Sequence, residues 1–363
     1  MTQQVVNFNA GPAGLPRPVL ERAQAEFLDF AGTGISVMEH SHRGKAYEKA
    51  HFEAISLTKE LLGVPDTHAI LFVQGGASQC FATVPMNFLP ADGSADYVIT
   101  GTWSKKALSE AKLIGQTKVA GTGEVEGNFI KIPKQSELKL DANAAYCHIT
   151  TNNTIAGTQW HSLPNTGNVK LVADLSSDIM WKKIDVSKFG LIYAGAQKNI
   201  GPSGVTMVIV DKAWAAAASQ KIPVIFRFQT HIENDSLYNT PPTFGIYMAK
   251  LVLEHLKETG GLDGAEKRNR EKGRILYGAI DGSGGFYKCP VETDARSLMN
   301  VVFRLPSEAL EEQFVKESEK LGMIGLKGHR SVGGCRASIY NAVTVEGVKQ
   351  LADFMAEFAR KNG

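Results

Sequence analysis

The chain has 363 residues, of which 43% are hydrophobic and 21% are charged, a composition typical of a folded protein and not of a disordered one. Its net charge of +2 is too balanced to indicate nucleic acid or a membrane surface as a partner, and no apolar run approaches the roughly 20 residues that span a bilayer. The four cysteines lie far apart without a C-x-x-C pair, and no secretory signal is evident, so we expect free thiols in a cytoplasmic protein.

The first part of the chain alternates loops with helices. Residues 1–16 read as an extended segment, and the spacing of apolar residues predicts helices over 17–30 and 46–64. Between these helices, a glycine-containing loop carries His42 and Arg43.

Short apolar strands and helices then alternate, which is typical of a mostly parallel sheet covered on both faces. In such α/β folds the functional residues lie in loops at the carboxyl ends of the strands. The expected strands are 68–74, 95–101, 144–151, 169–177, 190–197 and 204–210, and the expected helices are 75–89 and 102–115.

The alternation of short strands and helices ends near residue 239, where a proline-containing loop precedes a long amphipathic helix ending near 261. Further helices are expected over 265–281, 309–322 and 344–363, with strands over 297–306 and 335–341. We therefore predict three parts: an extended segment 1–16, a large α/β domain 17–258 and a small α+β domain 259–363.

Lys198 is the single charged residue in GLIYAGAQKNIGPSG, residues 190–204. Burial disfavours the charged form of a lysine and lowers its pKa, which makes the amine nucleophilic toward a carbonyl group. Most lysines near strand ends instead reach solvent, so the residue alone leaves both interpretations open.

Three other features match the needs of pyridoxal phosphate. Asp174 ends a predicted strand and would hold the pyridine nitrogen protonated, while the glycine turn before Ala77 and Ser78 would receive a phosphate. Trp103, at the end of another strand, can stack on a planar ring. Each has an ordinary alternative, namely a helix cap, a routine turn and a packing tryptophan.

Several motifs in order along the whole chain resemble the phosphoserine aminotransferase family. They are HSHRGK, ADYVITGTW, LVADLSSDIM, IYAGAQKNIGPSG, NTPPTF and KGHRSVGGCRASIYNA. The resemblance implies a homodimeric fold type I enzyme that uses pyridoxal 5'-phosphate. It would transfer an amino group between glutamate and 3-phosphohydroxypyruvate, giving O-phosphoserine and 2-oxoglutarate.

The resemblance also implies roles around the cofactor. Lys198 would form the Schiff base and move the substrate proton, and Asp174 would pair with the ring nitrogen. The other cofactor-binding residues implied are Ala77, Ser78, Trp103, Thr154 and Gln197, with Asn239 and Thr240 reaching the cofactor phosphate of the neighbouring subunit.

For the anionic substrates, the resemblance implies that Arg336 binds the α-carboxylate and Arg43 binds glutamate. His42, Arg43, His329 and Arg330 form a basic set suited to the distal phosphate or carboxylate. Arginine suits such groups because its planar fork donates in bidentate fashion. Some relatives have arginine in place of Ser78 and serine in place of Ala10, so these two contacts are in doubt.

Other functions stay open at this point. Serine–glyoxylate and aminophosphonate transaminases share the fold, and so do cysteine desulfurases, for which Cys335 would be the candidate nucleophile. A non-catalytic module that binds nucleotides or anions is disfavoured, because the chain lacks the P-loop and G-x-G-x-x-G patterns. No metal-ligand spacing appears, and use of the phosphorylated oxo-acid of pyridoxine synthesis is undecided.

Overall fold

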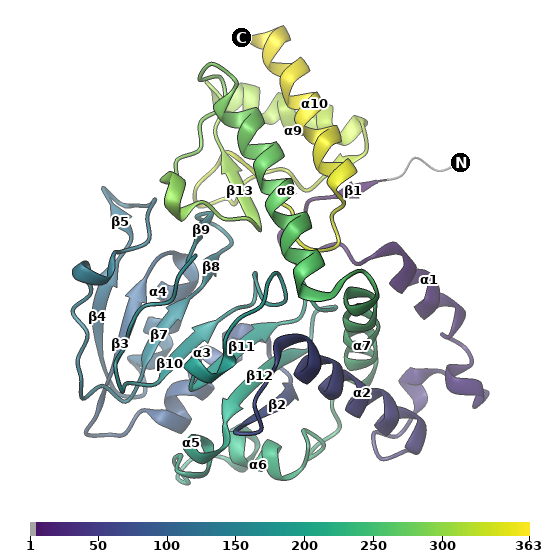
Figure 1. The fold of residues 1–363 in the computed structure, drawn as a ribbon, viewed down its shortest axis with the longest axis vertical. Coiled ribbons are helices and arrows are strands. Elements are labelled where there is room, and N and C mark those ends of the chain that lie inside the picture. The colour runs from purple at the N-terminus through teal and green to yellow at the C-terminus, as the bar shows by residue number, and fades with distance from the viewer. Residues whose placement is uncertain (1–4) are drawn as a thin grey trace.

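A seven-stranded sheet forms the centre of the larger part of the molecule, in a computed structural model that describes residues 5–363 (Figure 1). The strands lie in the order β2-β12-β11-β10-β7-β3-β4. Only β12 runs antiparallel to its neighbours β2 and β11, and the remaining pairs are parallel. The strands are β2 (His68–Val73), β3 (Ser94–Ile99), β4 (Gln116–Thr122), β7 (Cys147–Thr150), β10 (Leu171–Asp174), β11 (Leu191–Gly195) and β12 (Thr206–Asp211).

The central strands are apolar on both faces because helices cover both sides of the sheet. On β11, Ile192 packs with one core and its neighbour Tyr193 with the other, as the alternation of side chains in a strand requires. The first core includes residues of α2 (Lys45–Leu62), α7 (Thr243–Glu258) and the start of α8 (Gly261–Asp281). The second includes residues of α3 (Gly76–Phe88), α4 (Thr102–Ala111), α5 (Lys212–Ala216) and α6 (Phe228–Glu233).

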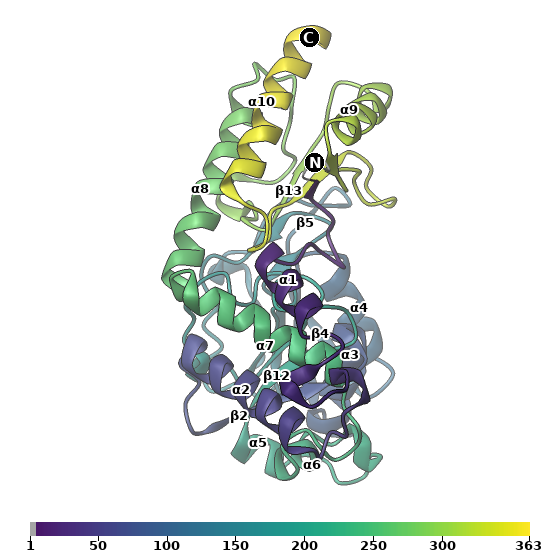
Figure 2. The same ribbon diagram turned by 90° about the vertical axis from the view of Figure 1, so that its right-hand side faces the viewer.

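The C-terminal part has a separate core of its own. Figure 2 shows α8 beside α10 (Val345–Asn362), with α9 (Glu308–Lys320) on the other side of β13 (Asn300–Phe303). β13 pairs antiparallel with β15 (Cys335–Ser338). Side-chain caps begin two of these helices, because Ser307 accepts from the Leu310 N–H and Thr344 accepts from the Gly347 N–H.

The N-terminal segment joins this C-terminal part. β1 (Val6–Asn7) pairs in parallel with β14 (Met323–Ile324), and Phe8 is buried in the C-terminal core. The described residues begin at 5, so the first four residues of the predicted segment 1–16 lie outside them. α1 (Arg17–Ala25) follows and is shorter than the helix predicted over 17–30.

Small elements complete the chain. The short strands are β5 (Glu124–Val125), β6 (Asn128–Phe129), β8 (Asn152–Asn153) and β9 (Thr158–Gln159). The single-turn 3-10 helices are Phe30–Gly32, Val37–Glu39, Gln135–Glu137, Val186–Lys188, Val224–Phe226 and Thr293–Ala295.

The α/β fold with a mostly parallel sheet is confirmed, whereas the domain limits stay predictions. The predicted limit at 258/259 falls between α7 and α8, yet Leu262 and Ala265 of α8 still pack into the core of the large sheet. Within residues 5–363, no helix combines the length and apolar character needed to cross a membrane.

Candidate active site

A cavity of about 420 Å³ lies at the carboxyl ends of β7, β10 and β11, where parallel α/β sheets place their ligands. This volume falls within the range of small-molecule sites. Its walls include residues that are distant in sequence but meet at this edge of the sheet. Among the residues predicted for the site, the cavity is lined by Ala77, Ser78, Trp103, Thr154, Asp174, Gln197, Lys198, His329 and Arg336.

Lys198 lies in the turn that follows β11, and its amine points toward the other predicted groups. Its Nζ donates a hydrogen bond of 2.6 Å to the Thr154 Oγ1 and lies 5.8 Å from the centre of the Trp103 ring. Burial lowers the pKa of Lys198 to about 8, while the nearby Asp174 carboxylate opposes that change. The amine is therefore far more often neutral near pH 8 than an exposed lysine.

Asp174 ends β10 and is buried beside this lysine. Its Oδ1 accepts the Ser176 N–H at 2.9 Å, and Asp174 pairs in register with Tyr193 of β11. Burial raises the pKa of Asp174, because removing a carboxylate from water disfavours its charge. A cationic or protonated group placed in the cavity would compensate for that loss of solvation.

The glycine turn between β2 and α3 forms part of the cavity wall. Gly75 and Gly76 have φ values of 89° and 66°, in the left-handed region that favours glycine. At Gly75 a Cβ atom would also lie 2.0 Å from the Gln79 Oε1. The turn places Ala77 and Ser78 in the first turn of α3, where free N–H groups and the helix dipole favour an anion.

Trp103 stands in the first turn of α4, and this helix begins directly after the tightly packed Gly101. A Cβ atom on Gly101 would lie 2.2 Å from the Oδ1 of Asn153, so α4 and β8 approach closely here. The buried Nε1 of Trp103 finds no hydrogen-bond partner among residues 5–363. Trp103 thus lines the cavity with an aromatic ring on which a planar molecule could stack.

Arg336 reaches the cavity from β15 of the C-terminal part. Its Nη1 donates to the Thr154 carbonyl oxygen at 3.2 Å, and its buried Nε lacks a partner within the described chain. Burial lowers the pKa of Arg336 from its ordinary value, though a guanidinium stays charged at any physiological pH. Arg336 and Lys198 therefore both contact Thr154 and face the same cavity.

Five predicted residues lie outside the cavity of this single chain: His42, Arg43, Asn239, Thr240 and Arg330. The Thr240 carbonyl oxygen accepts from the Gln74 Nε2 at 3.1 Å, which places it next to the glycine turn. The roles given to these five residues stay predictions.

Sequence reasoning missed several residues that line the cavity: Gly11, Thr150, Asn152, Ser176 and Ser177. The polar run after β7 and the serines after Asp174 are the signals that could have indicated four of them. Asn152 matters structurally, because its Nδ2 donates to the Ser177 Oγ at 2.7 Å and to the Asn300 Oδ1 at 2.8 Å. It thereby links the site to the C-terminal part.

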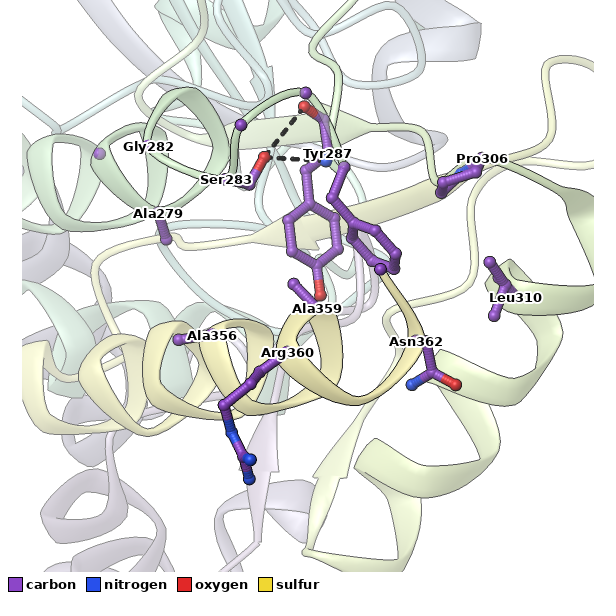
Figure 3. A pocket seen from close by; sticks show the side chains of 15 residues that line it. Ala279, Gly282, Ser283, Tyr287, Pro306, Leu310, Ala356, Ala359, Arg360 and Asn362 are labelled. Carbon is purple, nitrogen blue, oxygen red and sulfur yellow. Dashed lines mark hydrogen bonds between the residues drawn. The ribbon is translucent and has the colours of Figure 1, made fainter.

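A larger cavity of about 870 Å³ lies elsewhere, between α8, α10 and the turn after α8 (Figure 3). In that turn, the Tyr287 N–H donates to the Ser283 Oγ at 2.9 Å. Among the described residues that line this larger cavity, only Tyr287 and Arg360 have ionisable side chains. The larger cavity shares no lining residue with the Lys198 cavity. The chemistry-bearing residues thus gather in the smaller cavity.

Comparisons with known proteins identify the family of this chain. The family model Aminotransferase class-V matches residues 5–351. A phosphoserine aminotransferase of Herpetosiphon aurantiacus is 56% identical, covering 99% of both chains. The solved phosphoserine aminotransferase of Bacillus circulans subsp. alkalophilus is 54% identical, with a TM-score of 0.97 over 99% of each chain. A phosphoserine aminotransferase structure from Trichomonas vaginalis described as PLP-bound is 36% identical, with a TM-score of 0.92 over 97% of this chain and 99% of the other. The chain belongs to the class-V aminotransferases and, within them, to the phosphoserine aminotransferase family.

Proposed function

We propose that this protein is a phosphoserine aminotransferase that uses pyridoxal 5'-phosphate. It transfers an amino group between glutamate and 3-phosphohydroxypyruvate, in both directions, as a step of serine biosynthesis. The observation that carries the proposal is the position of the Lys198 amine, which contacts Thr154 inside a cavity that Asp174 also lines.

The residues present fit this cofactor group by group. The N-terminus of α3 suits its phosphate, Trp103 offers a face for its ring, and Asp174 offers a carboxylate whose burial calls for a positive partner such as the protonated ring nitrogen. When bound, the cofactor withdraws electrons from the α-carbon of the amino acid. Gln197 lines the wall beside the lysine.

Lys198 then has two tasks that follow from its position. Its Nζ would hold the cofactor through the aldehyde carbon, and once free it would take up and return the proton of the substrate α-carbon. A pKa of about 8 suits a base that must accept and return this proton near neutral pH. The hydrogen bond to the Thr154 hydroxyl orients the amine.

Arg336 supports recognition of the α-carboxylate that both substrates share. Arg336 lines the cavity, whereas Arg43 lies outside it in this single chain and would come from the neighbouring subunit. Each of these two guanidinium groups would bind one end of a dianionic substrate. We place His329 and Arg330 at the distal phosphate, together with His42. Ser78 cannot supply the charge of the arginine found in some relatives, so the phosphate depends more on these residues.

A homodimer completes the proposal. Asn239 and Thr240 lie outside the cavity of their own chain, although the Thr240 carbonyl oxygen contacts Gln74 beside the glycine turn. In the proposed dimer they reach the cofactor phosphate of the neighbouring subunit, and His42 and Arg43 approach its substrate. Analytical ultracentrifugation of the wild type and a mixed-variant complementation assay would test this arrangement.

A cysteine desulfurase is disfavoured by the chemistry of Cys335. This thiol is buried in β15, and burial raises its pKa to about 12, which removes the thiolate that such a reaction needs. Other aminotransferases of the same fold remain the second candidate function, because Lys198, Asp174 and Arg336 would serve any α-amino acid.

The decisive experiment follows the cofactor absorbance of the purified enzyme during single half-reactions with O-phosphoserine, glutamate and alanine. We expect rapid change with the first two substrates and slow change with alanine. Lys198→Ala should abolish turnover, whereas the exposed Lys49→Ala should retain it. A wild type that reacts with alanine but not with O-phosphoserine would refute the assignment in favour of another aminotransferase.

A further inference from the structure

A glycine-containing loop, residues 328–334, contributes His329 to the wall of the cavity and also carries Arg330. An ion pair in the C-terminal part, between Arg304 and Glu311, holds this loop in place. We propose that this pair positions His329 against the side-chain phosphate of the substrate, so that Arg304 and Glu311 are positioning residues for O-phosphoserine. The inference rests on the proposed function and concerns the same site.

The ion pair is short and largely removed from water at its acidic end. Arg304 follows β13, and its Nε lies 2.7 Å from the Oε1 of Glu311 in the first turn of α9. The Glu311 side chain is 9% exposed and that of Arg304 is 42% exposed. The same Oε1 also accepts the Leu305 N–H at 3.3 Å, which fixes the carboxylate relative to the end of β13.

Each member of the pair also holds a backbone group of the loop. The second oxygen of Glu311 accepts the Gly334 N–H at 3.1 Å, and the Arg304 Nη1 donates to the Val332 carbonyl oxygen at 2.7 Å. The loop closes on itself through the Gly328 N–H, which donates to the Gly334 carbonyl oxygen at 2.8 Å. The pair therefore holds the loop at Gly334, where it closes, and two residues earlier at Val332.

The backbone of the loop fits directly onto the Arg304 side chain. Gly333 and Gly334 have φ values of 69° and 72°, in the region that favours glycine. A Cβ atom on Gly334 would lie 2.7 Å from the Arg304 Cδ and 2.9 Å from the Phe303 carbonyl oxygen. The loop thus needs both glycines to reach the ion pair.

Within the loop, the orientation of the His329 ring is also set. The Ser331 N–H donates to the His329 Nδ1 at 3.2 Å, and the Ser331 hydroxyl lies 2.7 Å from the same atom. Since a backbone N–H can only donate, Nδ1 acts as an acceptor, and the hydrogen of the neutral ring is on Nε2. His329 lines the cavity, so it can offer this Nε2–H group to an anion.

The substitution Glu311→Gln separates this role from bulk packing because it conserves shape. A carboxylate accepts from Arg304, Leu305 and Gly334, whereas an amide has one accepting oxygen and an NH₂ group that can only donate. In either orientation of the glutamine amide, its NH₂ group would therefore face another donor, either the Gly334 N–H or the Arg304 and Leu305 N–H groups. We expect the loop to loosen while β13 and α9 stay folded.

The test measures Glu311→Gln and Arg304→Lys in the full-length holoenzyme. Arg304→Lys keeps a charge near Glu311 but cannot also reach the Val332 carbonyl oxygen, and it serves if Glu311→Gln fails to fold. The matched control is Arg296→Lys, which alters an arginine paired with Asp281 at 2.7 Å, away from the loop. The readouts are the KM and kcat for O-phosphoserine, the cofactor absorbance, the melting temperature and amide hydrogen exchange in the loop.

We expect the KM for O-phosphoserine to rise about tenfold in both variants, as befits a weakened hydrogen bond to a charged group, with kcat within about threefold. Amide exchange at 328–334 should quicken, cofactor absorbance should persist, and the control should match the wild type. A lower melting temperature with unchanged KM would mean that the pair is merely structural and would overturn the proposal, as would unchanged loop exchange. Failure of this positioning proposal can be told apart from failure of the proposed function, because in the second case the wild type itself would not react with O-phosphoserine.

Discussion

The reactivity of the Lys198 amine in the cofactor-free protein gives the sharpest prediction. Burial lowers the pKa of Lys198 from an ordinary value of 10.5 to about 8. At pH 7 the neutral fraction of such an amine is about 10%, against about 0.03% for an unperturbed lysine, by the definition of the pKa. Burial thus increases the neutral fraction about 300-fold.

Two neighbouring charges shift the protonation equilibrium of Lys198 in opposite directions, so two substitutions should change its pKa with opposite signs. The Asp174 carboxylate favours the ammonium form and raises the pKa of Lys198, whereas the Arg336 guanidinium lowers it. Asp174→Asn should therefore move the midpoint of titration below about 8, and Arg336→Met should move it above that value. Both substitutions roughly preserve side-chain size.

The assay is trace labelling of cofactor-free protein with acetic anhydride between pH 6 and 11, followed by mass spectrometry of the Lys198 peptide. Labelling rises with pH because only the neutral amine reacts, and the peptide of the exposed Lys49 provides an internal reference. A wild-type midpoint near 10 would refute the burial argument. If both variants shifted in the same direction, the neighbouring charges would not be what controls Lys198.

Three further outcomes follow from the structure. Arg336→Lys should slow both half-reactions by a similar factor, roughly tenfold or more, because both substrates carry an α-carboxylate and lysine lacks the fork of arginine; single-turnover rates that fell for one substrate alone would assign Arg336 to a side-chain group. Gly101→Ala should destabilise the fold by about 1–3 kcal/mol in chemical denaturation, since its Cβ atom would lie 2.2 Å from the Asn153 Oδ1; unchanged stability would show that Asn153 moves away freely. Lys272→Met should lower stability by about 3 kcal/mol or more, because the buried Nζ donates to the carbonyl oxygens of Ile339, Tyr340 and Val343 at 2.7–3.0 Å; a neutral result would mean that those carbonyls find other donors.

Much of the fold was predictable because its signals are local. The apolar runs at 68–74 and 190–197 correspond to β2 and β11, and the helix predicted over 46–64 is α2, which Gly63 ends in the left-handed conformation. Strand β4 escaped prediction, since QTKVAGT has an exposed, mixed pattern typical of an edge strand. The pairing of β1 with β14 also escaped, because two-residue strands leave no periodicity to detect.

Part of the cavity lining was predictable from the sequence, but the geometry of the site was not. Lys198 and Asp174 could be found because each follows an apolar strand in a parallel sheet, and the cavity indeed brings them together. Arg336 came only from the resemblance, since an arginine inside a short strand is not distinctive. Arg304 and Glu311 gave no signal at all, because ion pairs that hold a loop look like any other charges in a sequence.

The distance between the two ends of the site depends on contacts that join distant parts of the chain. Lys198 belongs to the large sheet and Arg336 to β15, and side-chain amides connect the segments that follow them. The Asn341 N–H, after β15, donates to the Oδ1 of Asn199 at 3.0 Å, and Asn341 itself accepts from the Asn269 Nδ2 at 2.8 Å.

Such hydrogen bonds are directional, so they fix the register of two segments where apolar contact alone would tolerate sliding. In the proposed mechanism Arg336 binds the α-carboxylate and Lys198 moves the α-proton, so the distance between these two side chains depends on that register. Asn199, beside the lysine, therefore connects the turn that carries Lys198 to the segment that follows the strand of Arg336, and in the proposed mechanism it keeps the base and the carboxylate-binding group at a fixed separation.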